Sequence, residues 1–162
     1  MKLIVTGHDF SGKSTFLKTL YNELNDEKMS FIHLSYREPT DYTFYDQILN
    51  FSNFIMDRSF LDEVVYAPVF GRVLGLSDLD VLHLLNKVNK LDIKFIIFEC
   101  TDEELNKRIK KRTSNQEEES EVLENLKYIK EQYRKLAEKY NIKIIDTTNK
   151  TYADLRYEIM EE

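Results

Sequence analysis

The chain contains few of the residues that form disulfide cross-links or linkers between domains. Its 162 residues include one cysteine, four glycines, two prolines and no tryptophan. The single cysteine, Cys100, excludes an intrachain disulfide and any zinc site that needs several cysteines. Because glycine and proline are scarce, there is no flexible or polyproline linker. With 42% hydrophobic residues, the sequence predicts one well-buried domain over 1–162.

Also absent is any apolar run near the roughly 20 residues that span a bilayer. The N-terminus lacks the organisation of a signal peptide. We therefore expect a soluble, cytoplasmic protein with no membrane partner. The formal charge of −6 argues against a broad nucleic-acid surface, although it leaves room for a locally basic pocket.

The most informative segment that is present is GHDFSGKST, residues 7–15, directly after the apolar run 3–5. This pattern is a phosphate-binding P-loop between a strand and a helix. The residues expected to hold ATP are Gly7, Ser11, Gly12, Lys13, Ser14 and Thr15. In such loops the lysine reaches the β- and γ-phosphates and the following serine binds Mg²⁺. The alternative is a strand-to-helix turn that binds no ligand.

Hydrophobic periodicity predicts alternating strands and helices. Strands are expected at 3–6, 29–34, 54–56, 93–98 and 142–145. Helices are expected at 13–24, 43–51, 61–74, 78–91, 101–112, 122–140 and 152–160. Five strands with helical crossovers predict an α/β fold with a doubly wound, five-stranded parallel sheet flanked by helices, with ligands at the carboxyl ends of its strands.

Two predicted strands are followed by a carboxylate beside an arginine. These pairs are Arg37-Glu38 and Asp57-Arg58. An arginine offers a fixed fork of donors to phosphate oxygens, and a carboxylate can hold Mg²⁺ or accept a hydroxyl proton. Phosphoryl transfer needs these groups. Structural salt bridges at the strand ends are the alternative.

The sequence resembles the thymidylate kinase family in three places. These are the loop with its aspartate, Asp9, the Arg37-Glu38-Pro39 segment, and Asp57-Arg58 followed by Tyr66. The resemblance runs over nearly the whole chain and implies the three-layer fold of P-loop kinases, with ATP and Mg²⁺ as cofactors. It also implies a homodimer formed through a helix face.

The same resemblance implies roles for individual residues. Asp9 would face the sugar 3′-hydroxyl of the acceptor, and Tyr66 would lie against the acceptor nucleotide. Asp57 and Arg58 would serve the metal-water shell and the phosphates. Arg108 and Arg112 fall in the stretch matching the family's mobile lid, around 108–120, where they would close over the transferring phosphate.

The acceptor-binding region, around 37–56, departs from the family. Only seventeen residues, 40–56, separate Arg37-Glu38-Pro39 from Asp57, far fewer than the family uses there. Phe44, Tyr45 and Phe51 are candidates for stacking on a base, or are core residues. Asp62 replaces a serine of the family, and Ala67 replaces a glutamine.

The sequence is also similar to deoxynucleoside kinases, in a Glu-Pro after the second strand and an acid-Arg-Ser triplet after the third. There the glutamate, here Glu38, takes the proton from the 5′-hydroxyl as a general base.

The resulting hypothesis is ATP-dependent phosphoryl transfer to a deoxynucleoside monophosphate, with dTMP as the first acceptor. A deoxynucleoside kinase is the alternative, followed by a nucleotide-binding regulator or a polynucleotide 5′-kinase. The proposed catalytic residues are Lys13, Glu38, Asp57, Arg58, Arg108 and Arg112, the acceptor-binding residues are Asp9, Arg37, Glu38 and Tyr66, and the metal ligands are Ser14 and Asp57.

The histidines are assigned no chemistry. His8 is expected to point outward from the loop, and His33 and His83 to lie at the edge of the core, since a lone histidine has no ligand partner. Cys100 is expected to be a buried residue that ends a strand.

Overall fold

A parallel five-stranded sheet forms the centre of the protein in a computed structural model, which describes residues 1–35, 40–112 and 115–161. The strand order is β2-β3-β1-β4-β5. The strands are β1 (Lys2–Gly7), β2 (Ser30–His33), β3 (Phe54–Asp57), β4 (Lys94–Glu99) and β5 (Lys143–Asp146). This arrangement confirms the predicted fold class.

The central strands are apolar on both faces because helices cover the sheet on both sides. Leu3 and Val5 of β1 pack toward one layer of helices, while Ile4 of the same strand packs toward the other. In β3, Phe54, Ile55 and Met56 are all buried. Continuous apolar runs in the sequence therefore correspond to strands at the middle of the sheet.

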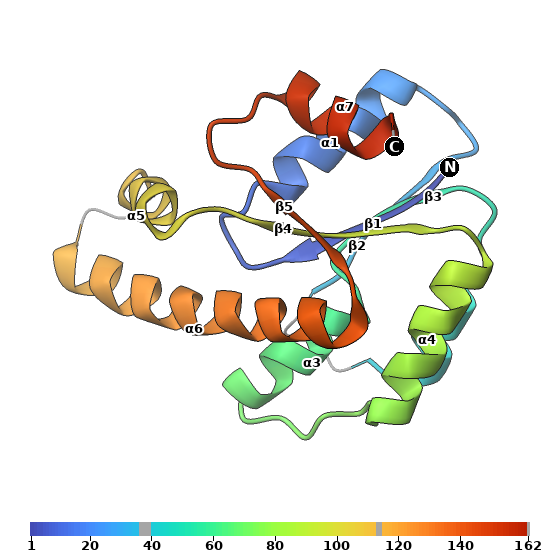
Figure 1. The fold of residues 1–162 in the computed structure, drawn as a ribbon, viewed down its shortest axis with the longest axis horizontal. Coiled ribbons are helices and arrows are strands. Elements are labelled where there is room, and N and C mark those ends of the chain that lie inside the picture. Colours follow the sequence, from blue (N-terminus) through green and yellow to red (C-terminus); the bar gives the residue numbers. More distant parts are fainter. Residues whose placement is uncertain (36–39, 113–114, 162) are drawn as a thin grey trace.

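Two helices, α1 (Lys13–Leu24) and α7 (Tyr152–Met160), cover one face of the sheet (Figure 1). The other layer contains α2 (Tyr42–Ile48), α3 (Phe60–Val69), α4 (Asp78–Lys90) and α6 (Gln116–Tyr140). The short helix α5 (Asp102–Lys110) follows β4 and packs its Leu105 and Ile109 into this second layer.

Helix α2 ends at Ile48 instead of residue 51, and α5 at Lys110 instead of residue 112. Two further helix boundaries differ from the prediction by five residues or more. Helix α3 ends at Val69 instead of residue 74, because Pro68 falls in its last turn and Gly71 adopts a left-handed φ of 66°. Helix α6 begins at Gln116 instead of residue 122. The Asn115 side chain caps it by accepting a hydrogen bond from the Glu117 amide, and acidic residues occupy its first turn, where the helix dipole favours them.

Across the described ranges, we find no helix whose length and apolar content would let it cross a membrane.

Candidate active site

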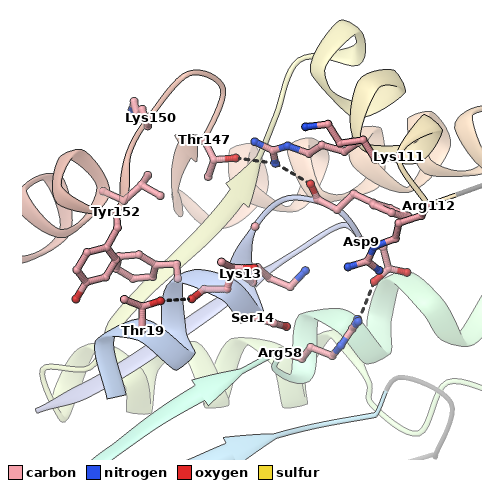
Figure 2. A pocket seen from close by; sticks show the side chains of 16 residues that line it. Asp9, Lys13, Ser14, Thr19, Arg58, Lys111, Arg112, Thr147, Lys150 and Tyr152 are labelled. Atoms are coloured by element: carbon pink, nitrogen blue, oxygen red, sulfur yellow. Dashed lines mark hydrogen bonds and ion pairs between the residues drawn. The ribbon is translucent and has the colours of Figure 1, made fainter. Parts of the chain in front are cut away.

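A cavity of about 700 Å³ opens at the carboxyl ends of the strands, above the start of α1 (Figure 2). Its lining includes six cationic side chains, Lys13, Arg58, Lys111, Arg112, Lys150 and Arg108, and one carboxylate, Asp9. The remaining lining residues are Phe10, Gly12, Ser14, Thr15, Phe16, Thr19, Thr147, Tyr152 and Leu155. In a chain whose net charge is −6, this concentration of positive charge favours a polyanionic ligand.

The two glycines of the loop are required by its geometry. Gly7 has φ of 134°, and a Cβ placed on it would lie 2.1 Å from the carbonyl oxygen of Phe98 on β4. Gly12 has φ of 93° and is the N-cap of α1, with no side chain bonded to the helix amides. The other helix N-caps in the described ranges are side-chain acceptors. The first amides of α1 are thus left for an anion.

Four consecutive loop carbonyls are held by side chains. The donors are Lys13 Nζ to His8 (2.8 Å), His8 Nδ1 to Asp9 (2.6 Å), Arg108 Nη1 to Phe10 (2.7 Å) and Thr147 Oγ1 to Ser11 (2.7 Å). Because the C=O and N–H of a trans peptide point in opposite directions, fixing these carbonyls also fixes the amides of residues 9–12. Elements α1, α5 and the end of β5 therefore shape this loop.

The prediction that His8 points outward is wrong, since its side chain is completely buried. Its Nδ1–H donates to the Asp9 carbonyl and its Nε2 accepts from the Cys100 amide at 3.3 Å. Burial, opposed by the bond to Asp9 and reinforced by Lys13, lowers the pKa of His8 to about 4. A neutral imidazole thus joins the loop to the end of β4. Cys100 is buried there, as predicted.

Lys13 combines burial with a position at the cavity. Its Nζ donates to the His8 carbonyl and lies 3.4 Å from the Ser11 hydroxyl. Burial, together with the nearby Arg58 charge, lowers the pKa of Lys13. An ammonium held by neutral acceptors in a nearly dry site can interact strongly with a phosphate.

Ser14 and Asp57, the two predicted metal ligands, are in direct contact. The Ser14 hydroxyl donates to Asp57 Oδ2 at 2.5 Å, and His33 Nδ1 lies 3.0 Å from the same oxygen. Asp57 is fully buried, and its Oδ1 has no hydrogen-bond partner within the residues described. A buried carboxylate oxygen beside a serine hydroxyl fits Mg²⁺, which prefers oxygen ligands and completes its shell with water and phosphate oxygens.

The described ranges contain no group of three or more histidine, cysteine or acidic residues that could hold a metal ion.

Arg58 lies between two carboxylates on the other side of the cavity. Its Nη2 donates to Asp9 Oδ1 at 2.8 Å, and its Nη1 lies 3.9 Å from Asp62 Oδ1. Burial disfavours the charge, but Asp62 and Asp9 outweigh burial and raise the pKa of Arg58. The residue has a left-handed φ of 80°, which is uncommon for a side chain of this size and typical of functional turns.

Asp62 stands where the thymidylate kinase family has a serine. It is the centre of a buried polar network that the sequence did not reveal. It accepts from the Thr6 hydroxyl, from the Ser59 amide at 2.5 Å and from the Tyr133 hydroxyl at 2.5 Å. Burial raises the pKa of Asp62, against the effect of Arg58 and of these donors. The network joins α6 to the turn that carries Arg58.

Tyr66 lies beneath Arg58 and outside the cavity lining. Its side chain is 2% exposed, and the Arg58 guanidinium carbon lies 6.0 Å from its ring centroid. Its contact with an acceptor stays a prediction. Of the candidates for base stacking, Tyr45 is a core residue and Phe44 and Phe51 are exposed. Arg37 and Glu38, the other predicted acceptor residues, lie outside the described residues.

The two arginines of the predicted lid both reach the cavity. Arg108 on α5 binds Glu104 at 3.0 Å as well as the Phe10 carbonyl. The Arg112 guanidinium carbon lies 4.9 Å from the Phe10 ring centroid, within cation–π range. Their closure over a phosphate stays a prediction, and the predicted lid includes residues 113–114, which lie outside the described part.

Sequence reasoning assigned no role to three residues at this site: Lys150, Thr147 and His33. Thr147 and His33 each lie at or just after the end of a predicted strand, which is the signal that could have identified them. Lys150 belongs to a loop without a motif, whereas Lys111, which also lines the cavity, falls within the predicted lid around 108–120.

Comparison with known proteins supports the fold. No protein-family model matches the sequence, and no curated protein matches it significantly. Among solved structures, the YorR protein of Bacillus subtilis in complex with phosphorylated GDP is similar, with a TM-score of 0.81 and 21% identity over 99% of this chain and 94% of that one.

Two kinases are similar at lower scores. They are the thymidylate kinase of Candida albicans (TM-score 0.59, 16% identity, 99% of this chain and 89% of that one) and the deoxyadenosine kinase of M. mycoides with bound dCTP (0.57, 14%, 99% and 98%). At these identities the similarity shows a shared α/β fold, a five-stranded parallel sheet flanked by helices.

Proposed function

We propose that the protein is an ATP- and Mg²⁺-dependent kinase that transfers a phosphoryl group to a deoxynucleoside monophosphate, with dTMP as the first acceptor to test. The observation that carries this proposal is the Ser14–Asp57 pair beside buried Lys13 at a cationic cavity, with an Asp57 Oδ1 that has no hydrogen-bond partner among the described residues. The similar structures include a thymidylate kinase, a deoxyadenosine kinase and a complex with phosphorylated GDP.

In this proposal the loop amides and Lys13 hold the donor phosphates. Ser14 and Asp57 would hold Mg²⁺, which neutralises charge on the phosphates as the phosphoryl group moves. Because the serine hydroxyl hydrogen is already directed to Asp57, its oxygen lone pairs remain for the metal. Lys13 acts on charge at the transferring group without gaining or losing a proton.

Arg58 is proposed to meet the transferring phosphoryl from the acceptor side, and Arg108 and Arg112 from the donor side. Asp9 fixes the direction of the Arg58 guanidinium and is itself placed to accept a hydrogen bond from an acceptor sugar hydroxyl. Arg37, Glu38 and Tyr66 are proposed to orient the rest of the acceptor. The lid around 108–120, and pairing of two copies through a helix face, belong to the same proposal.

A deoxynucleoside kinase is the second candidate, and the carboxylates around Arg58 favour it. Arg58 is compensated by both Asp9 and Asp62, so this part of the site is less positive than the donor side. A neutral hydroxyl acceptor, unlike a phosphate monoester, requires no excess of cations. It does require a base, for which Glu38 is the candidate.

The test is ADP production from ATP and Mg²⁺ with a panel of deoxynucleoside monophosphates, deoxynucleosides and 5′-hydroxyl oligonucleotides, with Lys13→Ala as the blank. ADP release stimulated by dTMP supports the leading proposal. Consumption of nucleosides alone replaces it with the second candidate, and stimulation by oligonucleotides alone assigns a polynucleotide kinase. ATP binding without stimulation by any acceptor identifies a nucleotide-binding regulator and overturns the kinase proposal.

Glu38→Gln separates the two kinase candidates. A phosphate acceptor carries its own nucleophilic oxygen, whereas a nucleoside hydroxyl must lose a proton. Loss of a general base should slow a nucleoside kinase by about 10²–10⁴-fold, and it should slow a nucleotide kinase far less. The rate is measured with saturating ATP and each acceptor that the panel identifies.

A further inference from the structure

His33 is the last residue of β2 and stands directly opposite Asp57 in the register of the parallel sheet. Its Nδ1 lies 3.0 Å from Asp57 Oδ2, while its side chain is 53% exposed. A carboxylate oxygen can only accept, so Nδ1 carries the hydrogen of this bond. The contact therefore holds with a neutral imidazole.

With this bond, the two oxygens of the Asp57 carboxylate have different hydrogen-bonding environments. Oδ2 accepts from two donors, Ser14 Oγ on α1 and His33 Nδ1 on β2, which approach from different elements. Oδ1 has no hydrogen-bond partner among the residues described and is buried. Two bonds to one oxygen resist rotation about the Cβ–Cγ axis, because a partial turn would move that oxygen away from both donors.

We propose that His33 is a positioning residue that orients Asp57 so that Oδ1 is presented to Mg²⁺, an inference that rests on the proposed function. Ser14 alone does not fix the carboxylate in this way, since a single hydrogen bond allows the group to turn about it, whereas a second donor from another element restrains that turn. His33 lies on the edge strand of the sheet, away from the donor phosphates, and can keep its bond while the metal binds. Partners of metal-binding carboxylates typically contribute 10–100-fold to metal affinity.

Two substitutions separate the hydrogen bond from the volume of the side chain. In His33→Asn the amide nitrogen occupies about the position of Nδ1 and can donate, whereas His33→Leu places a methyl group there. Both changes fall on a half-exposed side chain, so the fold should tolerate them. His83→Leu, at an exposed histidine of α4, is the matched control.

The measurement is the affinity for ATP by calorimetry, in Mg²⁺ and in EDTA, with thermal unfolding to check that each variant is folded. We expect His33→Leu to lose about 10–100-fold of the Mg²⁺-dependent gain in affinity and to keep the affinity in EDTA. His33→Asn should restore most of that gain, and His83→Leu should behave as the unmodified protein does.

Three results would overturn the inference: an unchanged Mg²⁺-dependent gain in His33→Leu, an equal loss in both His33 variants, or no gain in the unmodified protein. The experiment needs no acceptor, so it is separable from the proposed function. If Mg²⁺ strengthens ATP binding through His33 but no acceptor is phosphorylated, the kinase proposal fails and the role of His33 remains.

Discussion

The side of the cavity proposed to hold the phosphoryl donor and the side proposed to hold the acceptor are built in different ways. On the donor side, four consecutive carbonyls of the P-loop are bonded to side chains from the loop itself, α1, α5 and the end of β5. On the acceptor side, Arg58 is set between Asp9 and Asp62. The donor side thus fixes backbone and gathers cations, whereas the acceptor side fixes one cation with carboxylates.

This difference indicates what each side can recognise. Fixed amides and a group of cations suit a triphosphate of any nucleotide, because such groups would contact only oxygens that all nucleotides share. An arginine held by two carboxylates has a defined direction and little surplus charge. We therefore expect the donor side to determine strength of binding and the acceptor side to determine which acceptor reacts.

The largest expected effect is that of Lys13→Ala. Its ammonium is buried at the cavity, and loss of such a preorganised charge costs about 10²–10³-fold or more in rate. The comparison variant is Lys111→Ala, which removes an exposed cation from the same cavity and should cost less than about 5-fold, as exposed charges contribute at most about 1 kcal/mol.

Steady-state rates with ATP and the identified acceptor check this pair of variants. Equal losses of rate in both variants would mean that only the total charge of the donor side matters, and that this side is not a preorganised phosphate site.

The sequence was sufficient for those parts of the molecule that depend on local pattern. The bounds of α1 and α7 are as predicted, because a P-loop fixes the start of one and a Thr151 capping box the start of the other. Strand ends correctly located Ser14 and Asp57 near each other, since parallel strands deliver their carboxyl ends to one edge.

The contacts that were missed depend on distant parts of the chain. His8 was expected outside because its neighbours are loop residues, yet its partner Cys100 is 92 residues away. Tyr133 falls within the helix predicted at 122–140, and its hydroxyl reaches Asp62, 71 residues away. Periodicity predicts which face of a helix is buried, but it does not reveal which buried hydroxyl meets a carboxylate.

A second prediction tests the rigidity of the donor side through pH. The pKa of His8 is about 4 in the folded protein and about 6.5 when unfolded, so the unfolded chain takes up a proton first as the pH falls. Stability is therefore lost as pH falls from about 6.5 to 4, by up to about 1.4 kcal/mol per pH unit, or roughly 2 kcal/mol between pH 7 and 5.

Replacing the imidazole by an amide in His8→Gln should remove this part of the pH dependence, as measured by urea unfolding from pH 4.5 to 7.5. His83→Gln, on an exposed face of α4, controls for the loss of a histidine elsewhere. A His8→Gln protein that keeps the full slope would show that the loop histidine is not the group that titrates.

The smallest of these effects, and the one that separates the two sides most directly, is expected for Asp9→Asn. Its carboxylate is 30% exposed and directs Arg58. Hydrogen bonds to charged groups contribute about 1.5–3 kcal/mol, and partial exposure favours the lower value, so the acceptor KM should rise about 10-fold. The ATP affinity should be nearly unchanged, since the loop carbonyl of Asp9 remains bonded to His8.

Lys150→Ala provides the reciprocal change on the donor side, where Lys150 lines the cavity and pairs with Glu158 at 2.5 Å. It should weaken ATP binding by a few-fold, in line with a partly exposed charge, and leave the acceptor KM alone. Calorimetry with ATP and acceptor titrations at saturating ATP measure both quantities. If Asp9→Asn weakened ATP binding as much as acceptor binding, the two sides would act as one charged surface. A carboxylate that takes part only in acceptor recognition has no means of altering the affinity for the donor.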